Sequence, residues 1–417
     1  MRAFAIAIAF ALASGCGSRT GLEIPDAGPD AGQDAGPDAG RPPRPCIEAP
    51  RELGRVTVEM SIPASLAVVD ILFLIDSTGS MTDEIAAVRL GLRTRVVPGV
   101  RSAIPDAAFG VALFGEFPVR PHGPNDVLPF QLRSPITQDV ARVEASLEET
   151  PVWGNFDDAE AAIEGLFQVL TGAGYGAPGT PGFVPASIGC PSGGAGGACF
   201  RRDALPMVML ITDAPMHNGP PGVAPEAPYL FSPPPHGYPE TVEQARRLRT
   251  LVLGLGASDP GRPSALTHLR ALARDTGSVD ASGQPLVFDI GSRGSQIGDE
   301  IVRAVERVAS GVPLDVDAVA EDLPGDDVDA GEVLRGMRAV RADPPANVRA
   351  IEGERFLGVV PGTVLTFEVI VDASELPPSP ERRVYPARIL FRASGRSRLE
   401  AREVEIVVPG DDGRGCE

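Results

Sequence analysis

The stretch VVDILFLIDSTGSMTDEI, which runs from Val68 to Ile85, decides the fold. Residues 68–75 are almost entirely apolar, as expected of a strand that is buried on both faces of a parallel sheet. The apolar run ends at Asp76, which is followed by small hydroxyl-bearing residues and then by two acids. A buried strand that stops at clustered oxygen atoms predicts a ligand site at the carboxyl edge of its sheet.

Strand-like and helix-like segments alternate beyond this stretch. Apolar runs predict further buried strands at residues 107–117, 205–212 and 250–256. Apolar residues at helical spacing predict helices at residues 85–96, 138–149, 158–170 and 296–310. The alternation predicts an α/β domain with a doubly wound, mostly parallel, Rossmann-like sheet, which we place at residues 67–312.

The hydrophobic period changes to two on either side of this domain. Residues 55–62 alternate apolar and polar side chains before it, and strand-like runs follow it at residues 363–371, 387–393 and 403–408. This pattern is typical of an antiparallel β-sandwich. We therefore expect the α/β domain to be inserted into a sandwich formed by residues 46–66 and 313–417.

Residues 1–16 are interpreted as a signal peptide, and residues 17–45 as a disordered acidic tether that repeats Asp-Ala-Gly four times. Arg2 precedes an apolar stretch, residues 3–13, that is too short to span a bilayer. The sequence LASGC, which ends at Cys16, resembles the lipobox of bacterial lipoproteins, with alanine in place of the preferred leucine. The resemblance implies acylation of Cys16; ordinary secretory cleavage is the alternative.

The other four cysteines predict disulfides, because an even count in an exported chain is typical of them. Cys190 and Cys199 bracket a short Gly-rich loop and are predicted to pair. Cys46 and Cys416 sit at the two ends of the folded region, and a bond between them is predicted to clasp the sandwich. A zinc site is the alternative, but the spacing does not suit one.

The composition excludes several classes of function. The chain carries 56 acidic and 37 basic residues, which argues against nucleic acid or an anionic membrane surface as the main partner. It contains no lysine, and so lacks the residue that P-loops, kinases and Schiff-base enzymes require. Common hydrolase motifs are absent and the four histidines are scattered, so we expect no enzymatic activity.

Two further polar segments are expected near the carboxyl edge of the sheet. TDAPMH, residues 212–217, follows a predicted strand, and GNFDDAE, residues 154–160, precedes a predicted helix. Their oxygen donors suit Mg²⁺, Mn²⁺ or Ca²⁺ rather than zinc. Hydroxyl ligands carry no charge, so a cation held here keeps positive charge and attracts a further anion, such as a carboxylate of a partner.

These motifs resemble those of von Willebrand factor A domains, and most closely the A domain of integrin β subunits. DSTGS is similar to the Asp-x-Ser-x-Ser signature, and GNFDDAE, TDAPMH and YPET follow in the order of that family, over residues 68–316. In that family the A domain is also inserted into a β-sandwich. The integrin loop that sets ligand specificity has no counterpart here, so the resemblance does not identify a partner.

The resemblance implies a metal-ion-dependent adhesion site, or MIDAS. Thr78, Ser80 and Glu160 would bind the metal directly, and Asp76 and Asp213 through water. It also implies a second and a third metal site, held by Asp83, Glu84, Asn155 and Asp157.

Simpler interpretations of these residues stay open. DSTGS could be a turn in which Thr78 or Ser80 caps a helix. Asp83 and Glu84 could be ordinary first-turn acids that favour the helix dipole. His217 is interpreted as a packed neighbour of the site rather than as a ligand.

The sequence therefore predicts a metal-dependent, adhesion-like protein-binding lipoprotein of the cell envelope. Its partner would be a protein that offers an Asp or Glu carboxylate, and its contact with the membrane would be the lipid anchor alone. The anchor places it at the outer membrane or the cell surface, or facing the periplasm. A structural scaffold stiffened by the metal is the alternative function, and a metal-dependent hydrolase comes third.

Overall fold

The computed structural model describes residues 44–148, 150–190, 193–257, 265–291, 294, 296–323 and 327–416. The predicted signal peptide with Cys16, and nearly all of the predicted tether, lie outside the described residues. Within the described part of the chain, no helix has the length and apolar character needed to cross a membrane.

The first layer of the fold is a six-stranded sheet with strand order β5-β4-β3-β6-β7-β8. Its strands are, in sequence order, β3 (Val68–Asp76), β4 (Asp106–Phe114), β5 (Gln131–Thr137), β6 (Leu205–Thr212), β7 (Leu251–Gly256) and β8 (Val287–Asp289). All neighbouring pairs are parallel except β4 and β5. Every residue of β3 is buried, as its unbroken apolar sequence predicts.

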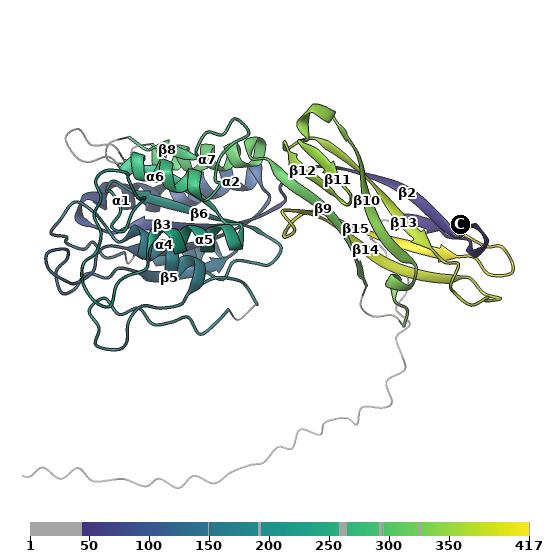
Figure 1. Cartoon of the computed structure of the whole chain (residues 1–417), viewed down its shortest axis with the longest axis horizontal. Helices are drawn as coiled ribbons and strands as arrows, with labels where there is room; N and C mark the ends of the chain where they lie inside the picture. Colours follow the sequence, from purple (N-terminus) through teal and green to yellow (C-terminus); the bar gives the residue numbers. More distant parts are fainter. Residues whose placement is uncertain are drawn as a thin grey trace, which may run out of the picture. The chain divides into compact units, whose positions relative to one another are not determined.

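Helices cover both faces of this sheet (Figure 1). Ile71 and Phe73 of β3 belong to one core cluster and Leu72 and Leu74 to the other, because successive side chains of a strand point to opposite faces. On the first face lie α1 (Thr82–Gly91), a π-helical turn (Leu92–Val96), α2 (Val97–Ala103), α3 (Val140–Glu148) and α7 (Ile297–Gly311). On the second face lie α4 (Ala162–Thr171), α5 (Tyr238–Leu248) and α6 (Ala265–Asp275). The predicted doubly wound, mostly parallel sheet is confirmed.

Mostly antiparallel strands form two further sheets, with orders β1-β15-β14-β9-β12-β11 and β10-β13-β2. The strands are β1 (Cys46–Glu48), β2 (Arg55–Pro63), β9 (Leu314–Asp322), β10 (Leu334–Asp343), β11 (Ala350–Glu352), β12 (Arg355–Val359), β13 (Val364–Asp372), β14 (Arg383–Ala393) and β15 (Ser397–Val408). Short 3-10 turns occur at Arg51–Leu53, Gly79–Met81, Ala330–Glu332 and Pro345–Asn347. The α/β elements lie in sequence between β2 and β9, as predicted for an inserted domain.

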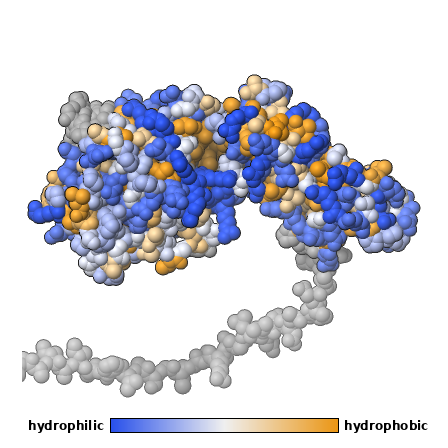
Figure 2. Space-filling view, in the orientation of Figure 1, coloured by the Kyte–Doolittle hydropathy of each residue, from blue (hydrophilic) through white to orange (hydrophobic). Residues whose placement is uncertain are grey.

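Two disulfides are present, Cys46–Cys416 and Cys190–Cys199, as the sequence predicts. Two strands precede the α/β elements rather than the single one expected, because β1 pairs in parallel with β15. Its three residues are too few to show a period of two. Figure 2 shows hydrophilic side chains over much of the visible face, interspersed with apolar patches.

Several predicted element boundaries are wrong. The helix expected at residues 158–170 begins only at Ala162, because Glu160 instead forms a β-bridge with Met216. The strand expected at residues 107–117 ends at Phe114. The helix predicted at residues 85–96 begins earlier and continues through the π-helical turn into α2.

Candidate metal centre

Asp76 ends the central strand of the parallel sheet, and its carboxylate is fully buried. Its Oδ1 accepts hydrogen bonds from the backbone N–H of Thr78, at 3.0 Å, and from the Thr78 hydroxyl, at 2.7 Å. Its Oδ2 accepts a hydrogen bond of 2.6 Å from the hydroxyl of Thr212 at the end of β6. The loop after β3 and the neighbouring strand together fix this carboxylate.

The hydroxyls of the DSTGS motif make no helix-capping bond. Thr78 precedes the 3-10 turn Gly79–Met81 but makes no side-chain capping hydrogen bond there. Instead its Oγ1 lies 3.4 Å from Oγ of Ser80, which donates a 3.0 Å hydrogen bond to Oδ1 of Asp213. Since β3 and β6 are parallel neighbours, their carboxyl ends meet, and this explains a contact across 133 positions.

The segment of residues 153–160 lies across the carboxyl ends of β3 and β6. Trp153 donates its N–H to the carbonyl of Ser77 at 2.8 Å. Farther along, the backbone N–H of Glu160 donates to the carbonyl of Pro215 at 3.0 Å. The carbonyl of Glu160 accepts a hydrogen bond from the backbone N–H of His217 at 2.9 Å. These backbone bonds carry the Glu160 carboxylate to the edge where Asp76 and Asp213 meet. A polar cleft of about 570 Å³ opens there, lined by Gly79, Ser80, Asn155, Phe156, Asp157, Asp158, Glu160, Asp213, Ala214 and Pro215.

The carboxylates at this edge are crowded and poorly solvated. Burial, and then the negative charge of Asp213, raise the pKa of Asp76 to about 7. Burial also raises the pKa of Glu160 well above its usual range, and nearby carboxylates, Asp76 first, add to the effect. Oε1 of Glu160 accepts a hydrogen bond of 2.5 Å from Asn155, whereas its Oε2 is buried without a partner among the described residues.

The donors at this edge fit a hard divalent cation. A buried carboxylate oxygen without a hydrogen bond is costly, and like charges nearby increase the cost. A cation bound between Asp76, Glu160 and Asp213 would compensate both effects. All donors are carboxylate or hydroxyl oxygens, which Mg²⁺, Mn²⁺ and Ca²⁺ prefer.

The residues predicted for the second and third metals do not form two clear clusters of ligands. Asp83 is exposed in the first turn of α1, while Glu84 is buried with its side chain beside Gly294. Nδ2 of Asn155 donates to the carbonyl of Asp157 at 2.8 Å as well as to Glu160. The carboxylate of Asp157 faces two histidines instead. Both additional sites stay predictions.

A group of residues beside this cleft is not predicted from the sequence. His122 and His217, which looked scattered in sequence, have ring centroids 4.7 Å apart, and Glu116 lies beside them. Glu116 comes two residues after β4 ends, at the same carboxyl edge as Asp76 and Asp213. Its position just after a third buried strand is the sequence signal that points to it.

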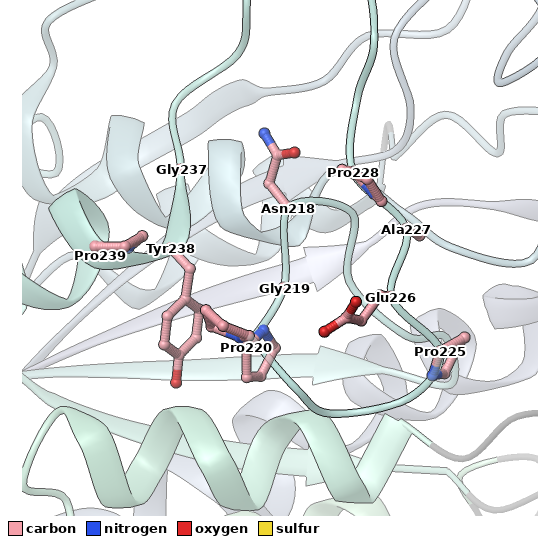
Figure 3. A pocket seen from close by; sticks show the side chains of 11 residues that line it. Asn218, Gly219, Pro220, Pro225, Glu226, Ala227, Pro228, Gly237, Tyr238 and Pro239 are labelled. Atoms are coloured by element: carbon pink, nitrogen blue, oxygen red, sulfur yellow. The ribbon is translucent and has the colours of Figure 1, made fainter.

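A second hollow lies in the segment that follows His217 (Figure 3). It measures about 340 Å³ and is lined mainly by prolines, with Glu226 and Tyr238. Asn218 ties this segment together, since its Oδ1 accepts from the N–H of Tyr229 at 3.0 Å and its Nδ2 donates to His236 at 3.2 Å. The hollow is largely apolar, so the polar cleft is the better candidate for binding a cation.

No model of a known protein family matches the chain, and neither does any curated protein. Among solved structures, a von Willebrand factor type A protein from Catenulispora acidiphila is 12% identical, with a TM-score of 0.38, over 88% of this chain and 72% of that one. The pilus adhesin SpaC from Lactobacillus rhamnosus GG, in its open conformation, is 14% identical, with a TM-score of 0.36, over 86% of this chain. The match spans only 45% of the adhesin's own length.

The strand order and the positions of the motifs identify the fold independently of these similarities. The sheet is parallel except at one edge, is covered by helices on both faces, and carries DSTGS at the carboxyl end of its central strand. Its α/β elements are inserted between strands of antiparallel sheets. The chain contains a von Willebrand factor A-like fold.

Proposed function

We propose that this chain is a cell-envelope protein that binds a partner protein through a divalent cation. The observation that carries the proposal is the convergence of Asp76, Glu160 and Asp213 from three segments, with one oxygen of Glu160 buried and without a hydrogen-bond partner among the described residues. Such a group of carboxylates gains most from a bound cation. The cleft beside it gives a partner access to the cation.

Each side chain would have a defined part in holding the cation. Thr78, Ser80 and Glu160 would bind it directly, and Asp76 and Asp213 would orient bound water, as the family resemblance implies. The cation supplies positive charge to a partner's carboxylate, which completes its coordination. Phe156 is 52% exposed on the lining of the cleft and would give the partner an apolar contact beside the charged one.

A structural role is the second candidate, favoured by the burial of Asp76. A cation that only satisfies buried carboxylates would stabilise the edge of the sheet without recruiting a partner. Envelope extract passed over the immobilised full chain distinguishes the two roles. The binding role predicts a protein captured with Mg²⁺ and released by EDTA, and the structural role predicts metal-dependent melting without capture.

The two disulfides are consistent with an oxidising compartment outside the cytoplasm. Together with the lipobox-like sequence at Cys16, they support a surface or envelope location for the proposed binding role.

A further inference from the structure

We propose that His122, Asp157, His217 and Glu116 form a separate histidine-containing metal site, different from the sites that the family resemblance implies, and that it takes a late divalent transition metal, Zn²⁺ above all. Nδ1 of His122 lies 2.8 Å from Oδ2 of Asp157, and Nε2 of His217 lies 3.1 Å from the same oxygen. One ligand atom from each of these three residues lies within 4.8 Å of the others. Ligand atoms around a tetrahedral zinc are about 3.3 Å apart, given bond lengths near 2.0–2.1 Å.

Glu116 supplies the fourth donor and an independent sign of a ligand. Its side chain is completely buried, and its Oε1 accepts hydrogen bonds from the N–H of Phe117 and the hydroxyl of Tyr229. Its Oε2 lies 3.3 Å from Nε2 of His217 and makes no hydrogen bond to any described residue. The buried carboxylate is therefore held in place with one oxygen directed into the cluster.

The orientation of His217 matches that of a metal-bound histidine. Its Nδ1 lies 2.7 Å from the carbonyl oxygen of Ala227, which can only accept, so Nδ1 carries a proton. In the neutral ring, Nε2 then directs a lone pair toward Asp157 and Glu116. Histidine ligands of metals usually donate their second N–H in this way to a carbonyl or carboxylate.

The cluster needs a cation, and a proton on Nε2 of His217 would not be enough. One N–H there points to Oδ2 of Asp157 at 3.1 Å and does not make a hydrogen bond to Oε2 of Glu116, which lies 3.3 Å away. Oε2 of Glu116 and Oδ1 of Asp157 are both buried without hydrogen-bond partners among the described residues. A metal ion can take several carboxylate oxygens at once, together with both imidazole nitrogens.

Aromatic packing holds the two imidazoles. The His217 ring stacks on Tyr229 with centroids 4.3 Å apart, and the His122 ring meets the edge of Tyr229 at 5.1 Å. Phe231 packs against Tyr229 in turn. Since Tyr229 also donates to Glu116, one side chain orients three of the four donors.

The two metal sites would select different ions. Imidazole nitrogens favour zinc and its neighbours over Mg²⁺ and Ca²⁺, whereas the oxygen-only site at Asp76 favours the hard cations. A metal at the histidine site would join the segment after β4 to the segment that carries Asp157 and Glu160. It would therefore stiffen one wall of the cleft, whether or not the cleft binds a partner.

Chelator-treated full-length protein, titrated with Zn²⁺ and separately with Mg²⁺, tests the proposal. Wild type is expected to bind one zinc ion that His122→Ala and His217→Ala both lose, while their affinity for Mg²⁺ is retained. Thr78→Ala is expected to show the reverse pattern. Tyr229→Phe, which keeps the packing but loses the bond to Glu116, is expected to weaken zinc about 10- to 100-fold. His236→Gln is the matched control and should leave zinc affinity unchanged.

Substitution by Co²⁺ gives a spectroscopic readout that needs no variant. A four-coordinate cobalt site with two nitrogen donors would show strong visible absorption in the folded wild type, and zinc would displace it. Absence of that absorption, or zinc affinity that is unchanged in both histidine variants, would overturn the proposal. The cluster would then be a charge network with a protonated His217.

Discussion

Thr212 donates a 2.6 Å hydrogen bond from its hydroxyl to Oδ2 of Asp76, and the two residues end adjacent parallel strands. The backbone N–H of Ala214 donates to the Thr212 hydroxyl at 3.0 Å, which leaves the hydroxyl proton for Asp76. The other oxygen of Asp76, Oδ1, accepts a hydrogen bond from the hydroxyl of Thr78. The carboxylate is thus fixed before any cation arrives.

Thr212→Val should therefore weaken Mg²⁺ binding about 10- to 100-fold, as loss of a group that orients a ligand usually does. It should also destabilise the fold by about 1–3 kcal/mol, because Asp76 loses a buried hydrogen bond. Titration calorimetry and urea unfolding measure the two effects. Thr94→Val removes an exposed hydroxyl elsewhere and should change neither quantity. Unchanged Mg²⁺ affinity in Thr212→Val would show that Asp76 does not serve the cation.

Arg201→Met should unfold the protein more easily by about 3–5 kcal/mol, because it leaves a buried carboxylate unpaired. Asp70 is fully buried in β3 and accepts bonds from the backbone N–H of Arg201, at 2.5 Å, and from its Nε, at 2.6 Å. Burial raises the pKa of Asp70 although Arg201 opposes the shift. Urea unfolding gives the difference in free energy.

Two controls sharpen this test. Arg93→Met breaks an ion pair with Glu144 in which Arg93 is exposed, and because solvent screens that pair, it should destabilise the protein far less than Arg201→Met. Asp70→Asn combined with Arg201→Met removes the unpaired charge and should recover part of the loss. Equal destabilisation by Arg93→Met and Arg201→Met would contradict the account.

Asp280→Asn should destabilise the protein at pH 7 but much less in acid. Hydrogen bonds from the hydroxyl of Ser282, at 2.6 Å, and from Arg307 lower the pKa of Asp280. A lowered pKa in the folded state adds stability above the unfolded value, 3.8, and that stability is lost as the pH falls through the folded value. The difference between wild type and variant, about 1–3 kcal/mol at pH 7, should shrink below pH 3.8. Urea unfolding at several pH values measures it, and a difference that grows in acid would reverse the predicted sign.

Cys16→Ser should release the protein from detergent-phase membranes, because acylation requires the cysteine sulfur. Fractionation of cells that express wild type and variant measures this. A wild-type protein that is already soluble and begins at a residue other than Cys16 would exclude a lipid anchor.

The elements that the sequence predicts best are those whose side chains are buried on one or two faces. The apolar run of β3 predicts a strand buried on both faces, and the alternation in β13 predicts a strand buried on one face. The start of α4 was misplaced because Glu160 sits in a helix-like pattern but forms a backbone bridge with Met216, a contact set by tertiary structure. No local pattern encodes such a bridge.

The sequence predicts that Asp76, Ser80 and Asp213 lie close together, because they come at or just after the ends of the neighbouring strands β3 and β6. The histidine cluster was not predicted, since His122 and His217 lie in loops and meet only when those loops fold back over the cleft. The full burial of Asp76 is not evident from the sequence either, because it depends on the loop after β3 and on Thr212 of the neighbouring strand.

The proposed metal centre holds a divalent cation between Asp76, Glu160 and Asp213, with the hydroxyls of Thr78 and Ser80. Titration calorimetry of the full chain with Mg²⁺, for wild type and for Asp76→Asn, tests it most directly, with circular dichroism to verify that the variant is folded. Wild type is expected to bind one Mg²⁺ and to gain about 2.7 kcal/mol of stability at a hundredfold excess over the dissociation constant, and Asp76→Asn is expected to lose both effects. Equal binding by the two proteins, or no binding by either, would contradict it.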